Sequence, residues 1–346
     1  MRIRGVQRMR LWGRMLRNRL APGALILLYH RINELPTDPQ LLNVRPGHFR
    51  KHLEILRKVA QPISLREFMN AHRERRKLRR VFMVTFDDGY RDNLELAKPL
   101  LEEYQAPATV SVASGYVGEN REFWWDELER LLLTPGKLPY QFQIRIRERV
   151  LNFDLGAYST YSVSDAKRYA FWNVAHPVCP TSRHSAYLVL YSELRTTNVA
   201  ARDEALRELR LLAGDGATAR ADYLAMDRQE IRQLRNGGLI EIAAHSVNHP
   251  CLSCISPAEQ QSEIRNSKTD LEKLLGIDVQ GFAYPFGASA DYDSHSLHFV
   301  GRSGFDWALS NYPAMASFHT DRFQLPRVLV GDWNGPKFTH FLREWV

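Results

Sequence analysis

Apolar runs of about six residues recur along the chain, and each ends abruptly in polar residues. The clearest are ALILLY at 24–29, VFMVTF at 81–86 and LIEIAA at 239–244. A short apolar run bounded by turn signals is typical of a buried strand. Further strand patterns follow in VQGFAY, DWALS and LPRVLV.

Helical patterns separate these strands. Ser64 and Glu67 form a capping box that predicts a helix start, and a second helix is expected over about 92–104. Ser256-Pro257-Ala258-Glu259 begins a third helix, which we expect to end at Gly276. Strands that alternate with helices predict an α/β fold with a parallel sheet. In a barrel of this kind the strand ends meet at one face, where active sites form.

The alternation stops between residues 120 and 225. YQFQIRIRERVLNF at 140–153 alternates with period two, as a hairpin does, and long helical stretches follow. We therefore predict an inserted, mostly helical cap at 120–225 on a barrel formed by 23–119 and 226–346. Its aromatic residues either line a sugar-binding groove or form the core of the cap; they are Trp124, Trp125, Tyr140, Tyr158, Tyr161 and Trp172.

The charge is uneven. Of the net +8, seven charges come from arginines in residues 1–20, which contain no acid, so the remainder carries about +1. This composition gives no hint of a basic face on the folded body, and we expect no nucleic-acid partner. Met9, Trp12, Leu16 and Leu20 recur among these arginines at helical spacing. Residues 1–22 are therefore predicted to form a basic amphipathic segment, which either contacts an anionic membrane or is a solvated arm.

The apolar run that follows this segment is too short to span a bilayer, and no signal-peptide cleavage site is evident. We therefore expect a cytoplasmic protein, which is either peripheral at the inner face of the membrane or free of it.

Candidate catalytic residues follow the predicted strands. His245 and His249 are four residues apart, so on one helical turn both rings would face the same side and could share a metal. Two histidines and one carboxylate leave coordination positions open, as catalytic metal sites require. Asp87 and Asp88 offer one carboxylate for the metal and one for a base. His30 alone would be read as a hydrogen-bonded core histidine.

Three motifs carry a resemblance to the NodB-type polysaccharide deacetylases: TFDDGY at 85–90, HSVNH at 245–249 and AYPFG at 283–287. The resemblance covers most of residues 24–335. It implies a distorted (β/α) barrel and a metal-dependent hydrolase that removes N-acetyl groups from amino sugars.

The resemblance also assigns roles to residues. Asp87 becomes the general base, and the metal ligands are Asp88, His245 and His249. The metal is a divalent ion, expected to be Zn²⁺, with Co²⁺ or Ni²⁺ as alternatives. The Phe286 backbone N–H, in the Tyr284-Pro285-Phe286 segment, is assigned to the oxyanion.

Two family features are missing here. The arginine that usually precedes the proline motif is absent, and we expect Arg327 to replace it by pairing with Asp87. The usual C-terminal histidine acid is also absent. In one branch of the family, the poly-N-acetylglucosamine deacetylases, the chain begins with a Tyr-His strand whose histidine supplies the acid. Tyr29-His30 resembles this feature, so His30 is the expected acid, and His319 is the alternative.

The sequence thus predicts a deacetylase of an amino-sugar polysaccharide or glycan precursor, with an N-acetylated saccharide as its partner. One alternative is a non-catalytic carbohydrate-binding protein on a degenerate barrel. Another is a deacetylase that acts on a lipid-linked or small sugar.

Overall fold

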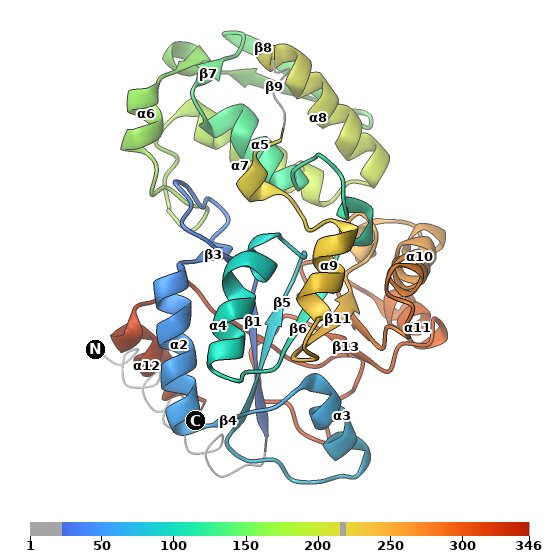
Figure 1. Ribbon diagram of the computed structural model, residues 1–346. Helices are drawn as coiled ribbons and strands as arrows, with labels where there is room; N and C mark the ends of the chain where they lie inside the picture. The colour runs from blue at the N-terminus through green and yellow to red at the C-terminus, as the bar shows by residue number, and fades with distance from the viewer. Residues whose placement is uncertain (1–22, 215–218, 346) are drawn as a thin grey trace, which may run out of the picture.

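A computed structural model of the chain describes residues 23–214 and 219–345 (Figure 1). The predicted amphipathic segment at 1–22 lies outside the described residues. Within them, the main sheet has eight strands in the order β13-β12-β11-β6-β5-β1-β14, with β4 also paired to β5. All of its strand pairs are parallel. The strands are β1 (Ala24–Tyr29), β4 (Gln61–Pro62), β5 (Val81–Phe86), β6 (Ala108–Val112), β11 (Ile240–Ala244), β12 (Gly281–Ala283), β13 (Trp307–Leu309) and β14 (Val328–Leu329).

The sheet curls without closing through regular strands. Its edge strands are β13 and β14, and near this gap Leu309 forms an isolated parallel bridge with Leu325. The central strands β1 and β5 are buried along their whole length, because helices cover one face and the curled interior covers the other. The α/β prediction of a distorted barrel is therefore confirmed.

Helices pack around the outside of this sheet (Figure 1). The predicted capping boxes are both present, at Ser64–Glu67 and Ser256–Glu259, and Gly276 ends the long helix in a left-handed conformation. The helix expected over 92–104 begins with one π-helical turn. The helical segments are α2 (Pro46–Val59), α3 (Leu65–Arg73), η1 (Asn93–Ala97), α4 (Lys98–Glu103), α9 (Arg228–Arg235), α10 (Pro257–Leu275), α11 (Ser294–Arg302) and α12 (Gly335–Leu342).

The inserted segment forms a second layer above the sheet in Figure 1. It contains the predicted hairpin, in which β8 and β9 pair antiparallel, together with several helices. Its apolar side chains build a separate hydrophobic cluster, in which Trp124, Tyr187 and Leu206 are buried. The elements are α5 (Trp124–Leu133), β7 (Gly136–Lys137), β8 (Gln141–Ile146), β9 (Arg149–Asp154), β10 (Thr160–Tyr161), α6 (Val163–Arg168), α7 (Ser182–Arg195) and α8 (Val199–Ala213).

The described helices are all too short or too polar to cross a membrane. The carboxyl ends of β1, β5 and β11 face the inserted layer, and the polar residues that follow them meet in one pocket there. The fold therefore gathers at one place the side chains that the sequence distributes over more than two hundred residues.

Candidate active site

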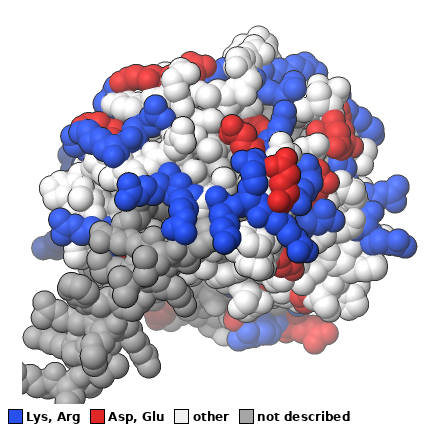
Figure 2. Space-filling model, turned by 90° about the horizontal axis from the view of Figure 1, so that it is seen from below, with Lys and Arg blue, Asp and Glu red and all other residues white. Residues whose placement is uncertain are grey.

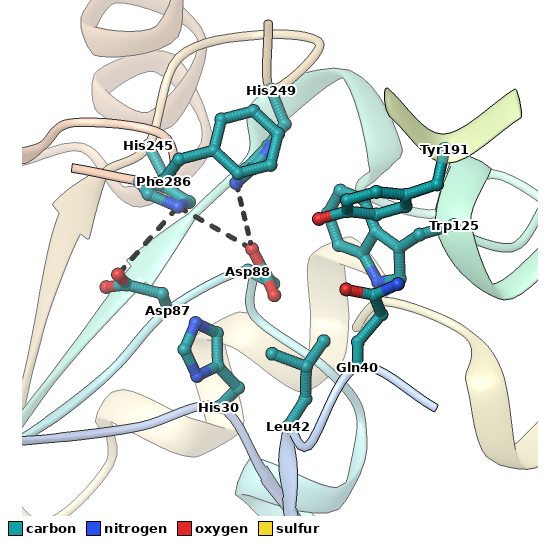
Figure 3. A pocket seen from close by; sticks show the side chains of 10 residues that line it. All are labelled: His30, Gln40, Leu42, Asp87, Asp88, Trp125, Tyr191, His245, His249 and Phe286. Carbon is teal, nitrogen blue, oxygen red and sulfur yellow. Dashed lines mark ion pairs between the residues drawn. The ribbon is translucent and has the colours of Figure 1, made fainter. Parts of the chain in front are cut away.

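The pocket lies between the carboxyl ends of the strands and the inserted layer (Figure 3). Loops after β1, β5, β11 and β12 form its floor, and helices of the inserted segment form one wall. Its lining residues are His30, Gln40, Leu42, Asp87, Asp88, Trp125, Tyr191, His245, His249 and Phe286.

Asp88, His245 and His249 converge in this pocket. Asp88 Oδ1 lies 3.5 Å from His245 Nε2 and 3.4 Å from His249 Nε2. One ligand atom from each of the three residues lies within 4.8 Å of the others, and all three residues are buried. Among the described residues, this Asp88 oxygen has no hydrogen-bond partner. A buried carboxylate oxygen without a donor is costly, and a cation at this point would satisfy it.

The two imidazoles are also favoured in the neutral form, which is the form that binds a metal ion. Burial lowers the pKa of His245, and burial together with His245 lowers the pKa of His249 well below its usual value. His245 Nδ1 lies 2.8 Å from the Ala283 carbonyl oxygen and donates to it, which leaves the Nε2 lone pair facing Asp88. Such a hydrogen bond fixes the ring and its tautomer. The three side chains therefore fit a divalent metal ion.

The helical turn expected across His245 and His249 is wrong. These residues lie in an irregular loop after β11, and Ser246 (φ +60°) and His249 (φ +53°) both adopt left-handed backbone conformations. Asp88, at φ +73°, does the same after β5. Non-glycine residues rarely adopt this conformation, and such strain is concentrated at functional sites. The rings meet because the loop folds back, not because of helical spacing.

Gly89 permits the tight turn after the two aspartates. Its φ is +83°, and an added Cβ would lie 3.1 Å from Val112 Cγ2. Glycine is the residue that fits there without strain.

Neighbouring helices hold the histidine loop. Glu263 of α10 accepts hydrogen bonds from the backbone N–H groups of Val247 and Asn248, each at 2.8 Å, and from the Asn248 amide. Arg202 of α8 donates to the carbonyl oxygens of Asn248 (3.0 Å) and His249 (3.5 Å). One anchor comes from the barrel and the other from the inserted segment, so both layers fix the position of His249.

Asp87 lies beside the three potential ligands and is paired with Arg327, as expected. Arg327 Nη1 and Nη2 donate to the two Asp87 oxygens at 2.7 and 2.6 Å. Burial alone would raise the pKa of Asp87, but Arg327 and His245 outweigh it and lower the pKa below its usual value. Asp87 is therefore ionised at neutral pH.

His30 lines the same pocket on the opposite side of Asp87 and Asp88 from the two metal-facing histidines (Figure 3). Its Nδ1 is buried without a hydrogen-bond partner among the described residues, whereas a core histidine would be hydrogen-bonded. Burial lowers the pKa of His30 to about 4, against an opposing effect of Asp87. The rival, His319, is exposed. It lies close in sequence to Ala316, which bridges to Ala24 at the opposite end of β1, so it does not reach the pocket.

The segment after β12 contributes Phe286. Its backbone is left-handed (φ +60°), and its ring contacts the His249 ring at a centroid distance of 4.7 Å. The predicted neighbours Tyr284 and Pro285 are buried but do not line the pocket. The Tyr284 ring stacks on Tyr292 in the core, and its hydroxyl donates to the Phe323 carbonyl oxygen. These two residues shape the segment rather than face a ligand.

Several lining residues were not foreseen as site residues. Gln40 and Leu42 come from the loop after β1, and Tyr191 comes from α7. Of the aromatic residues proposed for a sugar groove, Trp125 lines the pocket, with its ring 4.8 Å from that of His249. Tyr140, by contrast, is exposed outside it. No local pattern marks these contacts, because loop and cap residues meet the barrel only in the folded chain.

Comparisons with known proteins agree with this geometry. A family model described as polysaccharide deacetylase matches residues 74–135 and 212–305. The poly-β-1,6-N-acetyl-D-glucosamine N-deacetylase of Escherichia coli K12 is 28% identical over 97 residues, which are 28% of this chain and 14% of that enzyme. The matched region is thus a small part of that relative.

Two solved structures share the fold. IcaB from Ammonifex degensii is 15% identical with a TM-score of 0.56, covering 94% of this chain and 97% of that one. The Streptococcus pyogenes deacetylase PplD in complex with acetate is 18% identical with a TM-score of 0.55, covering 92% and 97%.

Proposed function

We propose that this chain, whose residues 74–135 and 212–305 match the polysaccharide deacetylase family model, is a metal-dependent hydrolase that removes N-acetyl groups from an amino-sugar polysaccharide or glycan precursor. The observation that carries the proposal is the convergence of Asp88, His245 and His249 beside a separate, ionised Asp87. A three-ligand site with a free carboxylate next to it suits hydrolysis of an amide.

Asp88, His245 and His249 would hold the divalent ion. When bound, the ion supplies Lewis-acid polarisation and makes water easier to deprotonate. Zn²⁺ is our first choice because two imidazoles and a carboxylate are common zinc ligands, and Co²⁺ or Ni²⁺ are alternatives.

Asp87 acts as the general base in this scheme. Arg327 keeps it ionised and oriented, so it can accept a proton from the water that attacks the acetyl carbonyl. The Phe286 backbone N–H donates to the oxygen on which negative charge develops, and such preorganised donors are usually a large part of catalysis.

His30 protonates the departing amine, which is a poor leaving group otherwise. The ring is neutral at pH 7 without substrate, since burial lowers its pKa. Negative charge that develops next to the ring raises its pKa, so the ring takes up a proton from water and passes it to the amine nitrogen as the C–N bond breaks.

Two features support an N-acetylated saccharide as the substrate. The matched relative in E. coli is named for poly-N-acetylglucosamine, and this pocket presents Trp125 and Tyr191, flat surfaces suited to sugar rings. Tyr191 directs its hydroxyl into the pocket (Figure 3), and burial raises its pKa to about 12, so it stays a neutral hydrogen-bonding group.

The non-catalytic alternative rested on the missing motif arginine. Arg327 contacts Asp87 with both of its terminal nitrogens, which favours a catalytic site over a decayed one.

The experiment is acetate release from a panel of N-acetylated saccharides, including poly-N-acetylglucosamine oligomers, small N-acetyl sugars and a lipid-linked N-acetyl sugar. We expect release from the oligomers that stops with a chelator and returns with Zn²⁺. Binding of the oligomers without acetate release under any metal condition would support the carbohydrate-binding alternative instead.

A further inference from the structure

The loop between α3 and β5 concentrates positive charge on the folded body. Residues 73–80 contain six lysines and arginines and one acid, Glu74. All six basic side chains are exposed. The overall composition does not reveal this basic face, because acids elsewhere offset these charges in the net charge. The folded body nevertheless has a strongly basic loop, which we call the 73–80 loop.

Nearby acids neutralise part of this charge. Arg73 pairs with Asp306 at 3.1 Å, and Arg76 pairs with Glu74. Arg75, Lys77 and Arg80 have no ion-pair partner among the described residues. Figure 2, which views the molecule from below, shows blue side chains gathered across the middle of this face. A surface on which Arg75, Lys77 and Arg80 lack an ion-pair partner among the described residues attracts polyanions.

The chain also enters the described structure at this loop. The Gly23 N–H donates to the Leu78 carbonyl oxygen at 2.8 Å. The described residues therefore begin beside the 73–80 loop. In the sequence, the segment with seven arginines and no acid at 1–20 directly precedes this point.

The pocket lies at the other end. Arg80 precedes β5 and Asp87 follows it, and six strand residues span about 20 Å. A partner bound at the 73–80 loop would leave the pocket open on the far side. The surface is therefore separate from the proposed catalytic site.

We propose that the 73–80 loop docks the protein on an anionic membrane surface. Clusters of four to eight basic residues next to a membrane-binding segment bind anionic lipids. A membrane is favoured over nucleic acid because Met9, Trp12, Leu16 and Leu20 alternate with the arginines of the adjoining segment at helical spacing. Large apolar side chains in that pattern gain free energy in a lipid interface. The sequence-based expectation of membrane contact concerned residues 1–20 alone; the docking surface proposed here is on the folded body.

The test is sedimentation of the full chain with phosphatidylcholine vesicles, with and without phosphatidylserine. The variant Arg75→Gln/Lys77→Gln/Arg80→Gln removes three charges that have no ion-pair partner to lose. The matched control, Arg147→Gln/Lys167→Gln/Arg168→Gln, removes three exposed charges from the inserted layer at the opposite end. Circular dichroism, thermal melting and acetate release check that each variant is folded.

We expect binding only to the phosphatidylserine vesicles, weakening as salt is raised above about 0.1 M. The loop variant should bind at least roughly ten-fold more weakly, and the control should bind like the wild type. Equal binding by the loop variant and the wild type would overturn the proposal, since residues 1–20 would then account for all binding. Tighter binding to duplex DNA than to the vesicles, with the same loss in the loop variant, would overturn it in favour of nucleic acid.

Discussion

Arg327 and Asp87, 240 residues apart, are joined by two parallel hydrogen bonds of 2.7 and 2.6 Å. Both side chains are almost completely buried. The Arg327 Nε also donates to the Ser310 carbonyl oxygen at 2.9 Å, which fixes the plane of the guanidinium. A buried carboxylate is tolerated when it is paired in this way. The arrangement thus gives Asp87 a positively charged neighbour in a fixed orientation.

Replacement of Arg327 by Met should raise the pKa of Asp87, because burial then acts without its main opposing charge. The base would be ionised only at higher pH, so the acidic limb of the kcat/KM profile should move upward. We expect a loss of about 100-fold in kcat/KM at neutral pH. Stability should fall by about 3–5 kcal/mol, measured by denaturant unfolding.

Arg327→Lys is the matched variant. It keeps the positive charge but cannot form the bidentate contact with Asp87. The acidic limb of the kcat/KM profile should therefore shift less than in Arg327→Met. A Met variant with the wild-type pH profile would show that Arg327 does not control Asp87.

Replacement of His30 by Ala should reduce turnover by about 10²–10⁴-fold, because the departing amine loses its acid. Metal content should not change, since His30 is not one of the three converging residues. The comparison is steady-state acetate release alongside elemental analysis of the same sample. His319→Ala should behave like the wild type. Full turnover without His30 would remove it from the mechanism.

Replacement of Glu263 by Gln should weaken metal binding by about 10-fold or more. Loss of a residue that holds the metal ligands in position commonly has an effect of this size. A neutral amide offers one acceptor oxygen to a loop that now uses both carboxylate oxygens. Calorimetric titration of metal-free protein gives the dissociation constant. Glu259→Gln, which alters the cap of the same helix, is the control and should leave the constant unchanged. Equal constants for the two variants would mean that Glu263 does not position His249.

Asp126 predicts a pH dependence of stability. Burial raises its pKa to about 7, although Arg31 and the Tyr90 hydroxyl, which donates to it at 2.7 Å, act in the other direction. Between pH 4 and pH 7 the unfolded carboxyl is ionised while the folded one keeps its proton. The stability from this group is therefore complete below about pH 4 and is lost as pH rises to about 7.

Asp126→Asn cannot ionise and keeps an oxygen that can accept from Tyr90. Its free energy of unfolding relative to the wild type should therefore rise by a few kcal/mol between pH 4.5 and 7.5. The measurement is urea unfolding of both proteins across that range. A constant difference would show that Asp126 titrates normally.

Strand ends were the most predictable part of this protein. Each of 24–29, 81–86 and 239–244 contains a buried strand, and the polar residues after them meet, because parallel strands place their carboxyl ends at one edge. The motifs then gave the identity of the potential ligands. The two capping boxes were equally predictable from the sequence, because their hydrogen bonds join residues only three positions apart.

Long-range geometry was not predictable in the same way. The left-handed backbone at Ser246 and His249 replaced the expected helical turn, because Glu263 and Arg202, distant in sequence, hold that loop. Tyr284 matched the motif but turned into the core to stack on Tyr292. Such outcomes depend on packing between elements that no local pattern records.

The metal content of purified protein tests the central claim most directly. Elemental analysis should find one divalent ion per chain in the wild type and almost none in Asp88→Asn, because that variant loses the carboxylate among the three converging residues. A wild-type chain that binds no divalent ion even when Zn²⁺ is supplied, or an Asp88→Asn variant that binds as much as the wild type, would contradict it.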